Sequence, residues 1–220
     1  MKKKNKTNTI LNKLYLIRFW LKYKLLPNKK SYSQFGEDLL INKFFKNFTG
    51  SYVDIGCFHP IKYNNTMLLY LRGWNGTNID LNPTSIDLFN LIRKNDRNIC
   101  ACLSNKVKFT NIYFDNKYSP LNSVYLDNSK NFNIKGIKYK KVKTKIFSNL
   151  IKENFDFLNI DCEGSDYDIL KTINLNYYTP KLICIEPGSK YKKIYSYLYR
   201  HNYRLYKIKI ASHIFIKKSL

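Results

Sequence analysis

The sequence predicts an α/β fold in which a mostly parallel sheet is covered by helices on both of its faces. Short runs of β-branched and aromatic residues alternate with amphipathic stretches at helical spacing, which is typical of parallel strands joined by helices. A hydrophobic content of 44% indicates a globular protein. The 220 residues suffice for one such domain with an appendage, but not for two full domains.

The first 30 residues differ in composition from the rest of the chain. Four lysines within the first six residues lead into apolar residues interspersed with further Lys and Arg, which predicts a basic helix that Pro27 ends. Such a helix would fit a membrane interface, with Trp20 at the boundary. The alternatives are a helix packed on the domain and a loose basic tail. We therefore divide the chain into a basic amphipathic helix or tail, residues 1–30, and a domain, residues 31–220.

In the first half of the domain, strands and helices alternate. A polar turn at residues 31–38 leads into an amphipathic helix with apolar residues from Leu39 to Phe48. Asn82 and Pro83 begin another helix, because Asn is a good N-cap and Pro fits the first turn. The remaining expected elements of this half are strands at 52–55, 77–81 and 98–103, and a helix at 64–71.

Residues 105–143 interrupt this alternation. An additional strand is expected at 107–114, and residues 115–136, which are rich in Asn, Ser and Tyr, are expected to form a loop. A loop of this length is either part of a substrate pocket or a flexible insertion without a role. The alternation then resumes with a helix near 147–152, strands at 155–161 and 181–187, a helix at 191–199, and runs at 203–210 and 213–217 that suit an antiparallel hairpin at the sheet edge.

The strand at 52–55 runs into Gly56, and this junction suggests a cofactor site. Gly allows a tight turn that brings the backbone close to a ligand, and the helix that follows offers N–H groups to a nucleotide-like cofactor. Asp80 ends the next strand, near the offset of roughly 20 residues at which an acid meets ribose hydroxyls in nucleotide-binding folds. The alternative is an ordinary strand–turn–helix unit, because the full GxGxxG pattern is absent.

Two carboxylates stand at the end of a buried strand in the second half. Asp161 and Glu163 should both reach the crevice above the sheet, where ligands bind in open α/β folds. They can act as a general base, as an anchor for a hydroxyl or as metal ligands. The alternative is that one of them caps the next helix. At the start of that helix, Ser165 and Asp168 form a capping-box-like pair. His59 is a lesser candidate base, with a structural role as its alternative.

Charge and cysteine usage bound the partners and the compartment. The net charge of +24 would attract phosphates, anionic lipids or acidic glycans, unless it is a solvated surface without a partner. The five cysteines lack the spacing of a zinc site and indicate small buried side chains in a reducing compartment, so no metal site is predicted. Neither an apolar run of about 18 residues nor a signal-peptide pattern occurs. We expect a cytoplasmic protein, with residues 1–30 as a candidate contact to the inner face of an anionic membrane.

Several short motifs, taken together and in order, make the sequence resemble the FkbM family of S-adenosylmethionine-dependent methyltransferases. The motifs cover about residues 31–217 and are SQFGED at 33–38, YVDIGCFHP at 52–60, NT at 65–66, GWNG at 73–76, IDLNP at 79–83, DCEG at 161–164 and ICIE at 183–186. The resemblance implies a Rossmann-like class I methyltransferase fold, with a seven-stranded sheet whose last strand is antiparallel.

The resemblance also implies which side chains contact the cofactor, S-adenosylmethionine. The implied contacts are Glu37, Asp54, Gly56, Cys57, Asn65, Thr66 and Asp80. Asp80 would contact the ribose, and Glu37 and Asp38 would pack over the methionine end. Asp161 and Glu163 would face the acceptor as the catalytic residues. Asp80 stands where many members have Glu, but the shorter side chain should still reach. Cys57 replaces the more usual Ala, another small side chain.

The implied function is methyl transfer to a hydroxyl, expected on a sugar, a glycan or a glycolipid intermediate. The expected partner is therefore a small molecule or glycan, and a divalent ion is an option for which no site is predicted. One rival is a nucleic-acid (RNA) methyltransferase, but the sequence has no NPPY-like motif and no recognisable RNA-binding module, so nucleic acid is not expected. The other rival is a non-catalytic membrane-surface binding protein with the same fold, which residues 1–30 would favour.

Overall fold

The computed structural model describes Leu14, residues 16–18, Leu21, residues 29–114, Val124 and residues 138–218. The predicted basic helix of residues 1–30 lies almost entirely outside the described residues, although those between 14 and 21 are helical. The predicted loop at 115–136 also lies outside them, apart from Val124. The division of the chain at residue 30 therefore stays a prediction. No helix among the described residues has the length and apolar character needed to span a membrane.

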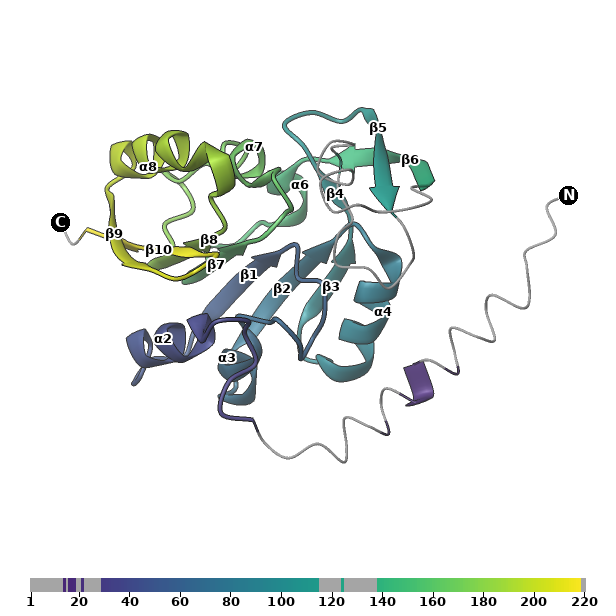
Figure 1. Ribbon diagram of the computed structural model, residues 1–220, viewed down its shortest axis with the longest axis horizontal. Coiled ribbons are helices and arrows are strands. Elements are labelled where there is room, and N and C mark those ends of the chain that lie inside the picture. Colours follow the sequence, from purple (N-terminus) through teal and green to yellow (C-terminus); the bar gives the residue numbers. More distant parts are fainter. Residues whose placement is uncertain are drawn as a thin grey trace, which may run out of the picture.

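Seven strands form the main sheet. They are β1 (Ser51–Ile55), β2 (Asn75–Asp80), β3 (Arg97–Cys100), β7 (Phe157–Ile160), β8 (Leu182–Ile185), β9 (Tyr203–Ile208) and β10 (His213–Lys217). Their order is β3-β2-β1-β7-β8-β10-β9 (Figure 1), and only the pairs that involve β10 are antiparallel. The predicted mostly parallel sheet with an antiparallel C-terminal hairpin is confirmed. β10 lies inside the sheet, and β9 forms its edge.

The strand order reverses direction at β1. From β1 the chain first builds outward through β2 and β3, and later returns to place β7 on the other side of β1. Residues Tyr52–Ile55 pair with 157–160 on one side and with 76–79 on the other. In open α/β sheets, ligands bind in the crevice above the carboxyl ends of the strands at such a reversal. The fold therefore places a crevice directly above Ile55.

Helices cover both faces of the sheet. On one face, Val53 and Ile55 pack with apolar residues of α6 (Phe147–Leu150), α7 (Asp166–Leu170) and α8 (Tyr191–Arg200). On the other face, Tyr52 packs with residues of α2 (Glu37–Phe44) and α3 (Met67–Leu71). Figure 1 shows α7 and α8 above the sheet and α2 and α3 below it. This separation follows from β1, whose successive side chains point to opposite faces.

The start of α4 (Pro83–Ile92) agrees with the prediction. Asn82 is the N-cap, and its side chain accepts a hydrogen bond from the Thr84 N–H at 3.0 Å, while Pro83 occupies the first turn. This cap follows β2 immediately, so that α4 begins at the same edge of the sheet as the crevice.

A second, three-stranded sheet lies beside the first. Its strands are β4 (Cys102–Leu103), β5 (Phe109–Phe114) and β6 (Lys138–Lys145), in the order β4-β6-β5. The strand expected at 98–103 is divided at Ala101 into β3 and β4, one in each sheet, and the strand expected at 107–114 is confirmed as β5. β6 was not predicted, because its sequence KYKKVKTK is rich in Lys, which strands disfavour. It forms along the whole length of β5, and most of its side chains are exposed.

Candidate functional site

A cavity of about 780 Å³ opens above the carboxyl ends of the parallel strands. Its lining includes Gly56 after β1, Asp80 at the end of β2, Asp161 after β7 and Glu186 after β8. Other walls come from residues 34–37 and from the three-stranded sheet. The volume lies within the range of small-molecule sites, roughly 300–1,000 Å³.

Gly56 makes the bend between β1 and the loop that follows. Its φ of 77° lies in the left-handed region, and its N–H donates to Ile79 O at 2.8 Å. A Cβ at this position would lie 1.7 Å from the backbone oxygen of Asp161. Only glycine therefore allows the ends of β1 and β7 to approach this closely.

Asp80 lies on the same cavity as Gly56 and is 9% exposed. Its Oδ1 accepts from the Asn82 N–H at 2.7 Å, and its Oδ2 accepts from the Phe58 N–H at 2.8 Å. Burial raises the pKa of Asp80 to about 6, even though these backbone hydrogen bonds favour the charged form. The carboxylate thus ties the loop after Gly56 to the end of β2.

Glu37 lines the cavity, but Asp38 does not. Glu37 is 2% exposed, and its Oε2 accepts from the Phe35 N–H at 2.9 Å. Its buried Oε1 has no hydrogen-bond partner among the described residues. The Asp38 carboxylate instead accepts from the Tyr32 N–H and from the hydroxyls of Ser31 and Ser33, so that it holds the loop before α2.

Of the other predicted cofactor contacts, Asn65 lines the cavity, whereas Asp54, Cys57 and Thr66 lie behind the described lining. Asp54 is 1% exposed and accepts from Thr66 Oγ1 at 2.9 Å and from Asn159 Nδ2 at 2.8 Å. Burial raises the pKa of Asp54, and burial of Cys57 likewise raises the pKa of its thiol. Direct contact of these three side chains with a cofactor stays a prediction.

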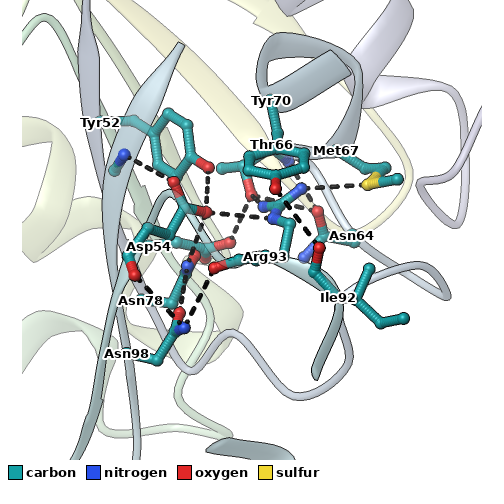
Figure 2. Close-up of polar contacts among 12 residues, drawn as sticks. Tyr52, Asp54, Asn64, Thr66, Met67, Tyr70, Asn78, Ile92, Arg93 and Asn98 are labelled. Carbon is teal, nitrogen blue, oxygen red and sulfur yellow. Dashed lines mark hydrogen bonds and ion pairs between the residues drawn. The ribbon is translucent and has the colours of Figure 1, made fainter. Parts of the chain in front are cut away.

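Behind Asp54 lies a buried polar network centred on Arg93 at the end of α4. Figure 2 shows its guanidinium between the polar groups of neighbouring strands and the start of α3. Arg93 is fully buried, donates to Thr66 Oγ1 and forms an ion pair with Asp96 at 3.1 Å. The Tyr52 hydroxyl and Asn78 Nδ2 also donate to Asp96. Through Thr66, Arg93 and Asp96, the network therefore connects Asp54 on β1 to Asn78 on β2.

The opposite wall of the cavity is acidic. The Asp161 N–H donates to Ile55 O at 2.9 Å, and its carboxyl lies near that of Glu186. Burial, followed by the Glu186 charge, raises the pKa of Asp161 well above its ordinary value. Glu163 has a φ of 48°, and burial with the nearby Glu186 and Asp166 charges raises its pKa to about 7. A non-glycine residue in this backbone region is strained, and such residues gather at functional sites.

The loop after Glu163 departs from the prediction. Ser165 is the N-cap residue of α7, but its side chain makes no capping hydrogen bond. Asp166 accepts from the Cys162 and Gly164 N–H groups at 2.8 and 3.0 Å, so it satisfies the loop amides in place of the expected capping box. Asp168 pairs with the ammonium of Lys190 at 2.9 Å.

His59 has a structural position. It is 5% exposed, and its Nδ1 accepts from the N–H groups of Ile61 and Lys62 at 3.1 and 3.0 Å. Burial lowers its pKa to about 3, so the ring is neutral. Across residues 29–114 and 138–218, no three His, Cys, Asp or Glu side chains are grouped so that they could hold a metal ion.

Four residues of the site and its support were not singled out from the sequence: Arg93, Asp96, Asn159 and Glu186. Glu186 had a usable signal, because it follows β8 directly as Asp161 follows β7. Arg93 and Asp96 had none, since such a pair at the end of a helix is typical of an exposed surface. Asn159 lies within an apolar strand, where one amide gives no indication of its partners.

Comparisons with known proteins identify a family for this chain and proteins of similar fold. The family model described as the methyltransferase FkbM domain matches residues 54–205. The FkbM methyltransferase from Methylobacillus flagellatus KT has a similar structure, with a TM-score of 0.56 and 12% identity over 84% of this chain and 48% of that one. This chain thus spans about half the length of that protein. A TehB-like SAM-dependent methyltransferase from Corynebacterium glutamicum has a TM-score of 0.50 and 14% identity, over 96% of this chain and 100% of that one. No curated protein matches the sequence.

Proposed function

The chain belongs to the FkbM methyltransferase family, and from that membership we propose that it transfers a methyl group from S-adenosylmethionine to a hydroxyl of a sugar, glycan or glycolipid intermediate. The observation that carries this proposal is that a single cavity joins the Gly56 bend, Asp80 and the acidic wall at Asp161 and Glu163. The first two suit a nucleoside, and the third suits a group that must lose a proton. We propose a cytoplasmic enzyme, and membrane contact through residues 1–30 stays a prediction.

The residues present fit the cofactor. Both oxygens of Asp80 accept one backbone N–H each and keep a lone pair for the two ribose hydroxyls. The buried Oε1 of Glu37, which lacks a partner among the described residues, suits the ammonium group at the amino-acid end. When bound, S-adenosylmethionine supplies a methyl group carried on a positively charged sulfur.

The acidic wall supplies the proton acceptor. With a pKa of about 7, Glu163 is ionised in an appreciable fraction of molecules at neutral pH and can take the proton of an acceptor hydroxyl. Burial and the nearby Glu186 charge raise the pKa of Asp161, so its carboxyl holds a proton more tightly than an ordinary Asp does. That proton can be donated in a hydrogen bond that orients the acceptor. Holding the hydroxyl in line for attack supplies much of the rate.

The charge of the cavity favours a neutral acceptor. Among the described residues that line it, six are acidic and two are basic, although the whole chain carries +24. A phosphate backbone would be repelled by the negative charge of this acidic wall. A sugar hydroxyl would not, and it can hydrogen-bond to the same carboxylates. This contrast supports a glycan acceptor over RNA.

Calorimetry with S-adenosylhomocysteine, the demethylated product of the cofactor, tests the proposal. We expect wild-type protein to bind it, and we expect Asp80→Ala to weaken binding by about tenfold or more, because a charge-assisted hydrogen bond is lost. Asp87→Ala is the matched control, since Asp87 lies exposed on α4 outside the cavity. If the wild-type protein binds no S-adenosylhomocysteine, the proposed function is wrong.

The role of Glu163 as the base leads to a second prediction, which concerns the pH dependence of turnover. The value of kcat/KM should rise with pH through a midpoint near pH 7, because the deprotonated Glu163 is the active form. Glu163→Gln and Asp161→Asn should lose most turnover while the affinity for S-adenosylhomocysteine is kept. The acceptor for this assay can be found by comparing surface glycans of a deletion strain for missing methyl ethers. Near-normal turnover in both variants would remove these residues from the reaction.

A further inference from the structure

We infer that Asn159 is a positioning residue for the amino-acid end of the cofactor. It fixes the orientation of the Asn65 amide, so that Asn65 presents its oxygen, and not its NH2 group, to the cavity. The ligand for that oxygen is the ammonium group of S-adenosylmethionine, so the inference rests on the proposed function and deepens it.

The orientation of Asn159 is set on β1. Asn159 is 4% exposed on β7 and lies directly opposite Asp54 in the parallel register. Its Nδ2 donates to Asp54 Oδ1 at 2.8 Å. A carboxylate oxygen accepts and does not donate, so the NH2 group of Asn159 must face Asp54. The oxygen of the same amide is then turned the other way, toward Asn65.

The orientation of Asn65 follows from that of Asn159. Asn65 Nδ2 donates to Asn159 Oδ1 at 3.0 Å and lies 3.8 Å from the sulfur of Cys184. Both contacts of the Asn65 NH2 group are therefore with the protein. Since Asn65 lines the cavity, its amide oxygen is the polar atom left for a ligand.

Protonation of Asp54 does not reverse the orientation of the Asn159 amide, and so it does not reverse that of the Asn65 amide. Its Oδ2 lies 2.9 Å from the Thr66 hydroxyl, which also lies 3.1 Å from Asn64 Oδ1 and accepts from Arg93. Figure 2 shows these groups around the guanidinium. A proton on Asp54 can sit on Oδ2 and point at the Thr66 oxygen, while Thr66 donates to Asn64. In both protonation states Oδ1 remains free to accept from Asn159.

The cavity then offers two acceptors at one end. Asn65 and Glu37 both line the cavity, Asn65 contacts Cys184, and the charge of Glu37 helps to raise the pKa of that same thiol, so both side chains lie near it. Glu37 contributes the buried Oε1 that has no partner among the described residues. An ammonium group has three donors and no acceptor, so two convergent oxygens suit it and an amide NH2 group would not.

Two ligands and one substitution test whether Asn159 fixes the orientation of the Asn65 amide. Asn159→Leu leaves the Asn65 amide free to turn. We expect it to weaken binding of S-adenosylhomocysteine about tenfold, equivalent to about 1.4 kcal/mol. Binding of 5′-deoxy-5′-methylthioadenosine, which shares the nucleoside and sulfur but lacks the amino-acid part, should change by less than about twofold, because it makes no ammonium contact. Calorimetry measures both. Asn98→Leu is the matched control. Among the described residues, the side chain of this partly buried Asn on β3 bonds to Asn78, Asn90 and the backbone oxygens of Arg93 and Asp96, and it bonds to neither Asn65 nor Asn159.

A second substitution separates orientation from folding. Asn65→Asp replaces the amide by a carboxylate, which presents an oxygen whichever way it is turned. Added to Asn159→Leu, it should restore most of the lost affinity for S-adenosylhomocysteine. If Asn159→Leu does not fold, Asn159→Ala takes its place in the same comparison.

The outcomes are distinct. Equal weakening of both ligands in Asn159→Leu, or no recovery on adding Asn65→Asp, would reduce Asn159 to a structural role and overturn the inference. Unchanged affinity for S-adenosylhomocysteine would overturn it as well. Wild-type protein that binds neither ligand would instead refute the proposed function itself.

Discussion

At the scale of single residues, the bend at Gly56 depends on the absence of a side chain. The position combines a left-handed φ of 77° with a Cβ site only 1.7 Å from a backbone oxygen of the neighbouring strand. Gly56→Ala should therefore lower the free energy of unfolding by about 4 kcal/mol, because β1 and β7 must separate to admit a methyl group. Urea denaturation monitored by circular dichroism measures this change.

Gly73 provides the matched control for this substitution. Its φ of 85° is equally left-handed, but no atom of the described residues lies within 4 Å of its Cβ site. Gly73→Ala should cost only the backbone strain, about 1–2 kcal/mol. Equal losses in the two variants would show that backbone strain alone, and not the close approach of the two strands, requires glycine at position 56.

The site residues that follow from the strand pattern alone are those at strand ends. Gly56, Asp80, Asp161 and Glu163 each follow or end a parallel strand of the sheet, and parallel strands bring their carboxyl ends to one edge, so their meeting on one cavity follows from the fold. The placement of Asp54 behind the cavity could not be predicted in this way. Strand alternation directs it to the same face as α3, but only the packing of Thr66 and Asn159 decides how far it lies from a ligand.

At the scale of elements, Arg93 joins the end of α4 to the start of α3 and to Asp96 before β3. Arg93→Met should cost about 3–5 kcal/mol, because it leaves the Asp96 charge buried without its partner. Thermal or urea unfolding measures this loss. Arg97→Met is the control: Arg97 is exposed and donates to Leu150 O, so its loss should cost about 1 kcal/mol. A cost for Arg93→Met no larger than for Arg97→Met would contradict a structural role for the buried ion pair.

The elements also show where pattern reading succeeds and where it does not. The central strands β1, β7 and β8 were predictable because their residues are mostly apolar, and the start of α4 was predictable because Asn82 and Pro83 mark it. β6 was not, since its stability comes from backbone pairing with β5 rather than from burial of its own side chains. The split at Ala101 was equally hidden, because an apolar run does not reveal that its two halves pair in different sheets.

At the scale of the whole molecule, the acids of the cavity make stability depend on pH. Asp80, Glu163 and Asp166 have folded pKa values of about 6, 7 and 7, all above their ordinary values. Because the folded state holds these protons more tightly, their contribution to stability is complete below about pH 4 and is lost as the pH rises through about 7. His59, with its pKa lowered to about 3, acts in the opposite sense and loses its contribution as the pH falls below about 6.5.

Substitution of one acid isolates this effect. Glu163→Gln cannot ionise, so it should match the wild-type free energy of unfolding near pH 4 and exceed it at pH 8. Urea denaturation at the two pH values measures the difference. Glu153→Gln, at an exposed position, should show the same small difference at both. If the difference in the free energy of unfolding between Glu163→Gln and wild type does not grow with pH, ionisation of Glu163 does not destabilise the folded state.

The position of β10 has a consequence for how this protein is made. A ribosome delivers the chain in order, so β9 emerges while the strand that will link it to β8 is still being synthesised. Until residues 213–217 leave the exit tunnel, β8, which is buried along its whole length in the finished protein, has an open edge. Open edges of apolar strands invite aggregation. Nascent chains of this topology therefore pass through an interval in which a chaperone has a defined strand edge to shield.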